Sequence, residues 1–410
     1  MNTWLKQILA LALIMMVFVA NGASNDEQWD EWEEEEAPSP FTFNSYAQVT
    51  LGHWLQPSQV SSQAVSPESS GSDWSRKLIT WRLEADYEQS FYQLSFKSDL
   101  GYYLVDSATY EKVRELSLKT DFSNLDSDHP LLNNEVIRNT ALSVGRQSLS
   151  WGVGDFIFIN DLFAKNWKSF FNGDDEQYLK QPNDAIRLSY FASTLNLDVI
   201  YQPRSNTDGL INTPKLKAPN GDAINARVYF SHQQRDYAMY ASNGWTTSPA
   251  YFDGKFQYLR RKSLGASMVS PLSGGLFKLE VGNYWLSANN TNSQQQFRWL
   301  IAYEQELRAR LTLALQLYQE RDTEHSQFDD RQMLTSQLSY QSKDSNWNSR
   351  LMVFYSPNHH DHYIRATSSY RHNDNITLTF GLNTMAGKEH SFFGSLSRQD
   401  NAYLRFTYYF

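Results

Sequence analysis

The last nine residues, AYLRFTYYF, alternate in a way that restricts what this chain can fold into. Every second position from Ala402 to Phe410 is apolar or aromatic, and the positions between them include Arg405 and Thr407. Such period-two alternation predicts a β-strand with one apolar face. A soluble domain rarely ends on a strand of this kind, because its free edge and its apolar face favour aggregation. We therefore expect other parts of the molecule or its surroundings to cover both.

Composition indicates what covers the edge and the apolar face of this last strand. The mean hydropathy of the 410 residues is -0.57, yet the chain contains 24 Tyr, 24 Phe and 12 Trp. After the first twenty-odd residues, no run approaches the ~18 to 20 apolar residues that a membrane-spanning helix needs. The strands of a transmembrane β-barrel alternate lipid-facing apolar and lumen-facing polar residues, so they are hydrophilic on average. The sequence therefore predicts a barrel whose last strand pairs with its first.

The N-terminus predicts export from the cytoplasm. Residues 1–23 contain Lys6, the apolar run ILALALIMMVFV and small residues suited to cleavage after Gly22 or Ala23. This pattern is typical of a secretory signal peptide, with an anchoring helix as the alternative. Residues 24–40 include eight acidic residues and no basic one, which predicts a disordered periplasmic tail. The chain has no Cys, so it forms no disulfide and carries no lipid-attachment cysteine.

Residues 41–410 show the alternation that predicts an all-β, antiparallel transmembrane barrel of about eighteen strands, within a range of 14 to 18. The expected strands are 41–55, 76–88, 91–104, 110–122, 138–151, 184–192, 195–203, 223–232, 236–244, 257–270, 276–287, 296–306, 309–320, 330–342, 347–356, 361–371, 375–386 and 400–410. Odd-numbered connections are mostly long, and even-numbered ones are short except for 123–137. Long outer loops and short periplasmic turns are typical of bacterial outer-membrane barrels, whereas a soluble β-sandwich predicts no such asymmetry.

The predicted lumen wall is basic. Where the alternation is clear, eleven cationic side chains and six acidic ones fall on the polar faces of the strands. Of these we expect Arg82, Arg187, Arg298 and Arg310 to line a pore, which would then favour anions. The alternative is that arginines and acids on adjacent strands pair and select nothing.

The longest outer connection, 152–183, combines six Phe and Trp residues with Lys165 and Lys168. Exposing this many aromatic side chains to water is unfavourable, and we therefore expect some of them to pack against protein. Folded into the barrel mouth, the loop would form a constriction with Arg146, Lys165 and Lys168. The alternative is a lid on the neighbouring outer loops.

The segment GRQSLSWGVGDFIFINDLF resembles proteobacterial outer-membrane proteins related to alginate-export porins. The matching residues are Gly145, Arg146, Gln147, Trp151, Gly152, Asn160 and Asp161. This resemblance implies an 18-stranded barrel with an Arg-rich lumen, which passes an anionic polysaccharide in one member. The present chain is short and its lumen carries only a modest excess of cations. Its final Phe also resembles the C-terminal signature that the barrel-assembly machinery reads.

Candidate catalytic residues are few. His359, His360 and His362 form a weak metal-ligand candidate, because consecutive side chains in a short turn diverge. There is no Gly-x-Ser-x-Gly and no phosphate-binding loop. We expect no enzyme activity, no cofactor and no nucleic-acid partner.

The sequence therefore predicts a channel in the bacterial outer membrane, a porin or exporter, which contacts lipid and lipopolysaccharide. It would pass hydrophilic solutes, small or polymeric, with a mild preference for anions. A plugged barrel acting as an adhesin or structural protein is the main alternative, and an outer-membrane hydrolase is the other.

Overall fold

A computed structural model describes residues 39–56, 73–104, 107–124, 134–210, 216–252, 254–288, 293–322 and 330–410. The predicted signal peptide, and the predicted acidic tail up to residue 38, lie outside the described residues. Residues 40–410 form one compact unit.

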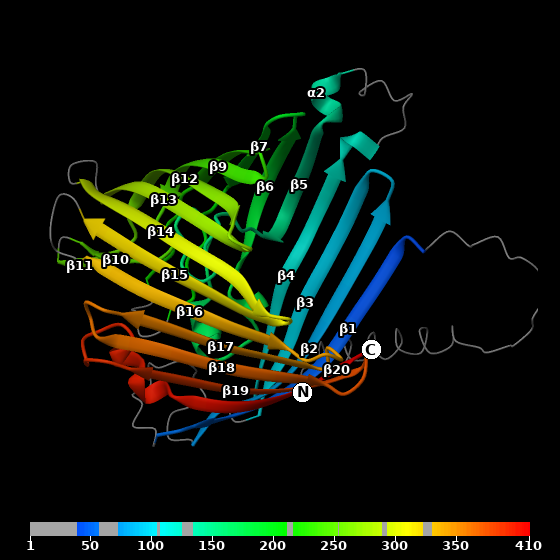
Figure 1. The fold of residues 1–410 in the computed structure, drawn as a ribbon. Coiled ribbons are helices and arrows are strands. Elements are labelled where there is room, and N and C mark those ends of the chain that lie inside the picture. The colour runs from blue at the N-terminus through cyan, green and yellow to red at the C-terminus, as the bar shows by residue number, and fades with distance from the viewer. Residues whose placement is uncertain are drawn as a thin grey trace, which may run out of the picture. The chain divides into compact units, whose positions relative to one another are not determined.

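Eighteen antiparallel strands form one sheet, in which each strand pairs with the next along the chain (Figure 1). The strands are β1 (Phe41–Trp54), β2 (Trp74–Gln89), β3 (Tyr92–Tyr103), β4 (Ala108–Asp121), β5 (Thr140–Ser148), β6 (Pro182–Phe191), β7 (Asn196–Gln202), β8 (Ala223–His232), β9 (Arg235–Trp245), β12 (Arg260–Leu272), β13 (Gly275–Ser287), β14 (Ser293–Arg308), β15 (Leu311–Asp322), β16 (Arg331–Gln341), β17 (Trp347–Ser356), β18 (Asp361–Arg371), β19 (Ile376–Ala386) and β20 (Asn401–Tyr409). Each boundary lies within three residues of its predicted position.

The last strand closes the sheet. β20 pairs with β19 on one side and with β1 on the other, where Phe406 lies opposite Val49. Closure pairs both edges of every strand in the described eighteen-stranded sheet, which explains how the chain tolerates an aromatic strand at its end. Leu404 and Phe406 are exposed on the outer face, whereas Tyr403, Arg405 and Thr407 are buried. The predicted barrel of eighteen strands is therefore confirmed.

Cross-strand register separates the two faces of the wall. Paired residues share a face, and one set of pairs is apolar and exposed, as in Leu264 opposite Ala241 and Leu118 opposite Val144. The other set is polar and buried. This is the pattern of a barrel with an apolar outer band and a polar interior. None of the described helices is long and apolar enough to cross a membrane.

The connections differ between the two ends of the barrel. One end carries the connections 55–73, 149–181, 203–222, 246–259 and 387–400, and we call it the long-loop end. The short hairpin β10 (Ala250–Phe252) and β11 (Lys255–Gln257) lies in one of these connections and was not predicted. The opposite end has mostly two- to five-residue turns, with the connection 122–139 and its short helix α2 (Glu135–Arg138) as the exception.

Candidate channel constriction

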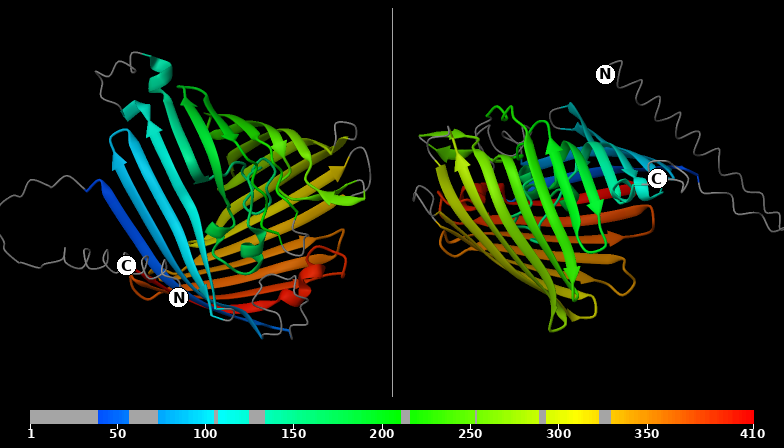
Figure 2. Two further views of the ribbon diagram at one scale, coloured as in Figure 1. Left: turned by 180° about the vertical axis from the view of Figure 1, so that it is seen from behind. Right: turned by 90° about the horizontal axis from the view of Figure 1, so that it is seen from above.

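The connection between β5 and β6, residues 149–181, lies inside the barrel, and we call it the inner loop (Figure 2). It contains the short helix α3 (Trp167–Phe171). Four of its apolar side chains, Ile159, Phe163, Phe170 and Phe171, are at most 5% exposed. Burial of apolar surface stabilises this position of the loop. Of the two predicted arrangements, the structure shows the loop in the barrel mouth.

Glu280, on the inner face of β13, holds the first half of the inner loop. Its fully buried carboxylate accepts hydrogen bonds from the backbone N–H groups of Val153 (3.1 Å), Gly154 (3.1 Å) and Asn160 (2.7 Å). Gly152 has a φ of +80°, and a Cβ there would lie 2.7 Å from Oε1 of Glu280. Glycine is therefore required where the loop passes this carboxylate.

Arginines from four separated strands hold the second half of the inner loop. Arg76 on β2 forms an ion pair with Asp174. Arg365 on β18 donates to the carbonyl oxygens of Phe170 (3.0 Å) and Asp174 (2.6 Å). Arg405 on β20 donates to the carbonyl of Gly173 at 2.8 Å. Arg114 on β4 donates to the carbonyls of Gln177 and Lys180, each at 3.2 Å. Much of the basic wall therefore binds the loop.

The carboxyl of Asp174 is held in its charged form. Burial alone raises its pKa, but the guanidinium groups of Arg76 and Arg405 outweigh burial and keep the pKa below its ordinary value. Because the folded-state pKa is lowered, the stabilisation is present above the unfolded pKa, about 3.9, and is lost as the pH falls through the folded value. This contact therefore persists throughout the neutral range.

We expect Asp174→Asn to loosen residues 170–178 at pH 7, because the neutral amide loses the ion pair with Arg76. Wild-type protein should show this change only below about pH 4. Hydrogen–deuterium exchange of the inner loop at pH 7 measures the effect, with Asp344→Asn in an exposed turn as the control. Unchanged exchange in Asp174→Asn would show that the carbonyl contacts alone hold this segment.

Three of the predicted pore arginines face the lumen, and each is paired. Arg82 is 0% exposed and binds Asp99 through two hydrogen bonds of 2.6 and 2.9 Å. Arg187 forms an ion pair with Asp198 at 3.1 Å. Arg298 forms one with Glu320 at 3.4 Å and donates to Gln296 at 2.7 Å. In each case the acid lies on the adjacent strand, as the pairing alternative predicted.

Arg146 and Arg310 do not lie where they were predicted. Arg146 is opposite Leu116, which is 60% exposed on the outer face, and it pairs with the exposed Asp184 at 2.7 Å. It therefore points away from the constriction. The register of β5 continues without a shift through Gly145, so Arg146 shares the outer face with Leu142 and Val144. Arg310 lies in the two-residue turn between β14 and β15, with a φ of +68°, and not in the wall.

Lys165 and Lys168 lie in the inner loop but differ in their surroundings. Lys165 is 3% exposed and pairs with Asp161 at 2.8 Å, so its charge is compensated. Lys168, on α3, borders a cavity of about 240 Å³ between the inner loop and β1–β4, which we call the basic cavity.

The basic cavity brings together four cations, Arg76, Lys112, Arg114 and Lys168. Of its two carboxylates, Asp174 is bound by Arg76, and Asp99 is bound by Arg82 and lies 3.8 Å from Nε of Arg114. Nη1 of Arg114 is buried and has no hydrogen-bond partner among the described residues. An anion in the cavity would therefore meet uncompensated positive charge.

Sequence reasoning missed Arg76, Lys112 and Arg114. Arg76 lies near the start of β2, where too few residues precede it to establish alternation. The register of β4 against β3 shifts between Lys97 and Ser98, which leaves Arg114 as an extra residue. Such a β-bulge reverses the inward and outward positions on either side of it. The only sign of the bulge in the sequence is in EKVREL, residues 111–116, where charged residues occupy both odd and even positions.

The histidine cluster is not assembled into a site. His359 and His360 lie in the turn between β17 and β18, and His362 points outward from β18, where it pairs with Tyr355. In the described part of the chain, no group of three or more His, Cys, Asp or Glu side chains could hold a metal ion.

The fold is similar to that of outer-membrane porins of known structure. OccAB1 of Acinetobacter baumannii has a TM-score of 0.57 and 9% identity, covering 92% of this chain and 99% of its own. A BenF-like porin of Pseudomonas fluorescens Pf-5 also has a TM-score of 0.57 and 9% identity, covering 90% and 98%. OccK2 (OpdF) of Pseudomonas aeruginosa, in complex with glucuronate, has a TM-score of 0.53 and 11% identity, covering 90% and 96%.

At these identities the likeness establishes the fold. No protein-family model matches the sequence, and no curated protein matches it either. The relation to alginate-export porins that GRQSLSWGVGDFIFINDLF suggested stays a prediction.

Proposed function

We propose that this chain is a channel of the bacterial outer membrane, in which the inner loop forms the constriction and small hydrophilic organic anions pass preferentially. The long-loop end faces outward, as in bacterial barrels generally. The observation that carries the anion preference is the basic cavity, where four cations meet two carboxylates and one of these, Asp99, also binds Arg82 outside the cavity lining. A site with such a charge excess raises the local concentration of anions.

Two further considerations favour small solutes with a carboxylate. A carboxylate is the natural partner of guanidinium and ammonium donors such as Arg114 and Lys112. The solved neighbour OccK2 (OpdF) binds glucuronate, which is a small carboxylate of this kind. A long polysaccharide fits less well, because the inner loop is bound to the barrel wall through both of its halves and so stays within the lumen.

The test is the current through the refolded mature protein in a planar bilayer under a tenfold KCl gradient. We expect an anion-selective reversal potential in wild type and a shift towards cations in Lys112→Gln. Lys343→Gln, in an exposed turn at the opposite end, is the matched control and should behave as wild type. A cation-selective wild type, or equal reversal potentials in the two variants, would refute the anion preference while leaving the channel in place.

The same inner loop favours a second candidate, a barrel closed by residues 149–181 that acts through its outer surface. Its supporting observation is the number of strands that hold the loop: β2, β4, β13, β18 and β20. Absence of conductance from protein shown to be folded would favour this candidate.

A further inference from the structure

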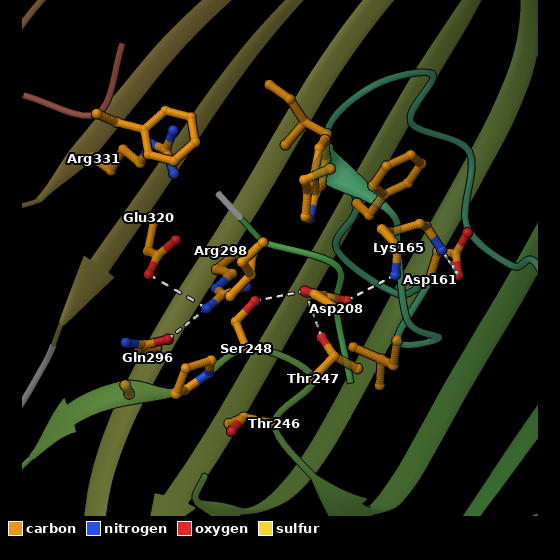
Figure 3. Close-up of a pocket in the computed structure, with 18 of the residues that line it drawn as sticks. Asp161, Lys165, Asp208, Thr246, Thr247, Ser248, Gln296, Arg298, Glu320 and Arg331 are labelled. Atoms are coloured by element: carbon orange, nitrogen blue, oxygen red, sulfur yellow. Dashed lines mark hydrogen bonds and ion pairs between the residues drawn. The ribbon is translucent and has the colours of Figure 1, made fainter. Parts of the chain in front are cut away.

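A second and larger cavity, of about 670 Å³, lies at the long-loop end on the other side of α3 (Figure 3). Thirteen of its lining residues are aromatic, and we call it the aromatic cavity. It shares no lining residue with the basic cavity. Helix α3 separates the two, because Trp167, Phe170 and Phe171 line the aromatic cavity whereas Lys168 and Ser169 line the basic one.

Three guanidinium groups line the aromatic cavity, those of Arg261, Arg298 and Arg331. The guanidinium of Arg331 lies 5.4 Å from the ring of Phe392, and this group forms no hydrogen bond or ion pair with any residue that the structure describes. Nε of Arg261 and Nε of Arg298 are buried and have no hydrogen-bond partner within the same ranges. These arginines therefore still have N–H donors that can bind an anion at this site.

The carboxylates of the cavity, by contrast, have partners. Asp208 accepts hydrogen bonds from the backbone N–H of Lys165 (2.7 Å) and from the hydroxyls of Thr247 (3.1 Å) and Ser248 (2.5 Å). Asp161 pairs with Lys165. Glu320 accepts from Tyr318 at 2.6 Å and pairs with Arg298. Figure 3 shows Arg298, Glu320 and Arg331 on one side of the cavity and Asp208 with Lys165 on the other.

We propose that the aromatic cavity binds an organic anion with a flat aromatic body, its rings packed against Phe158, Trp167 and Phe354 and its carboxylate bound by Arg331 and Arg298. A cavity of this size, mostly apolar with a few convergent polar groups, has the character of a small-molecule site. Aromatic side chains favour a planar ring through stacked and edge-to-face contacts. A sugar acid, which is polar on every face, would leave that surface unmatched. The proposal rests on the proposed function and adds a second class of solute to it.

The location of the site predicts how it would act. It lies at the long-loop end, beside the inner loop and not across it, so a bound ligand is held before the constriction. Such a site would concentrate ring-bearing anions at the entrance, while the basic cavity serves polar anions on the other side of α3.

The test is binding of 2-naphthoate to the folded full-length protein in detergent, measured by titration calorimetry against protein-free micelles. We expect saturable binding that glucuronate does not displace. Arg331→Gln should weaken binding at least tenfold, and Arg331→Lys, which keeps a cation, should weaken it less. Arg321→Gln is the matched control, because Arg321 is exposed, pairs with Asp330 and lies outside the cavity.

Three results would overturn the proposal: equal affinity of Arg331→Gln and wild type, equal affinity for the neutral 2-naphthamide, or displacement of naphthoate by glucuronate. Heat-dependent mobility on gel electrophoresis shows whether each variant is folded. Because binding is measured without a membrane potential, a barrel that does not conduct can still bind naphthoate, so failure of the channel and failure of this site give different results.

Discussion

Glu280→Ala is expected to release the first half of the inner loop from the barrel wall. The substitution removes the acceptor for the N–H groups of Val153, Gly154 and Asn160, of which the bond from Asn160 is buried and the other two are partly buried. An unsatisfied buried polar group costs about 1 to 3 kcal/mol, so the loss of this carboxylate should destabilise the docked loop by about 3 kcal/mol or more. Hydrogen–deuterium exchange of residues 152–160 should rise by about two orders of magnitude.

The release should also be visible in the current. Single-channel recordings of Glu280→Ala are expected to show larger and noisier conductance than wild type, because the loop no longer occupies one position. Glu280→Gln keeps one acceptor oxygen and should give a smaller effect. Glu304→Ala is the matched control on the adjacent strand, since the carboxylate of Glu304 is partly exposed and, among the described residues, pairs with Lys278 alone (3.2 Å). If exchange in Glu280→Ala matches that of Glu304→Ala, the other wall contacts of this half, such as Lys278 with Asp155 (3.0 Å) and Gln316 with Asp155 (2.7 Å), hold the loop without Glu280.

The strands could be predicted from the sequence because successive residues of a barrel strand face different environments, one lipid and the next the lumen. In LTLALQL, the leucines at 311, 313, 315 and 317 all fall on one face, and the register of β15 places them together. Lipid on one side and a polar lumen on the other enforce this alternation along each strand. The errors lie where the sequence pattern is mixed or broken: Arg146 follows the outward positions of Leu142 and Val144 on β5, and Arg114 lies at the bulge of β4.

The inner loop could be predicted only in part. Its aromatic residues indicate that it packs against protein, and they do line the lumen. Its anchors could not be found, because Arg76, Arg365 and Arg405 lie far apart in the sequence and meet at Asp174 and its neighbours only when the barrel closes. For the same reason the count of lumen cations overestimated the charge available to a solute. Most of those arginines bind the loop or an acid on the adjacent strand.

Arg82 and Arg146 provide a direct comparison, because both were predicted to line the pore and the structure places them in opposite environments. Arg82→Ala leaves Asp99, which is 1% exposed, without its two hydrogen bonds and removes the bond from Arg82 to Gln177 of the inner loop (2.5 Å). Removing one partner of a buried ion pair costs about 3 to 5 kcal/mol. Arg146→Ala breaks an exposed pair, which is worth at most about 1 kcal/mol.

Thermal unfolding of the two variants in detergent, followed by heat-dependent gel mobility, measures this difference. We expect a clear fall in the midpoint for Arg82→Ala and almost none for Arg146→Ala. The double variant Arg82→Met with Asp99→Leu separates two causes, because replacing both charges by apolar groups is often neutral for stability. If the barrel recovers its midpoint while the inner loop exchanges faster, the Gln177 contact positions the constriction independently of the ion pair. Equal midpoints for Arg82→Ala and Arg146→Ala would instead mean that Arg114, whose Nε lies 3.8 Å from Asp99, or water compensates the carboxylate once Arg82 is removed.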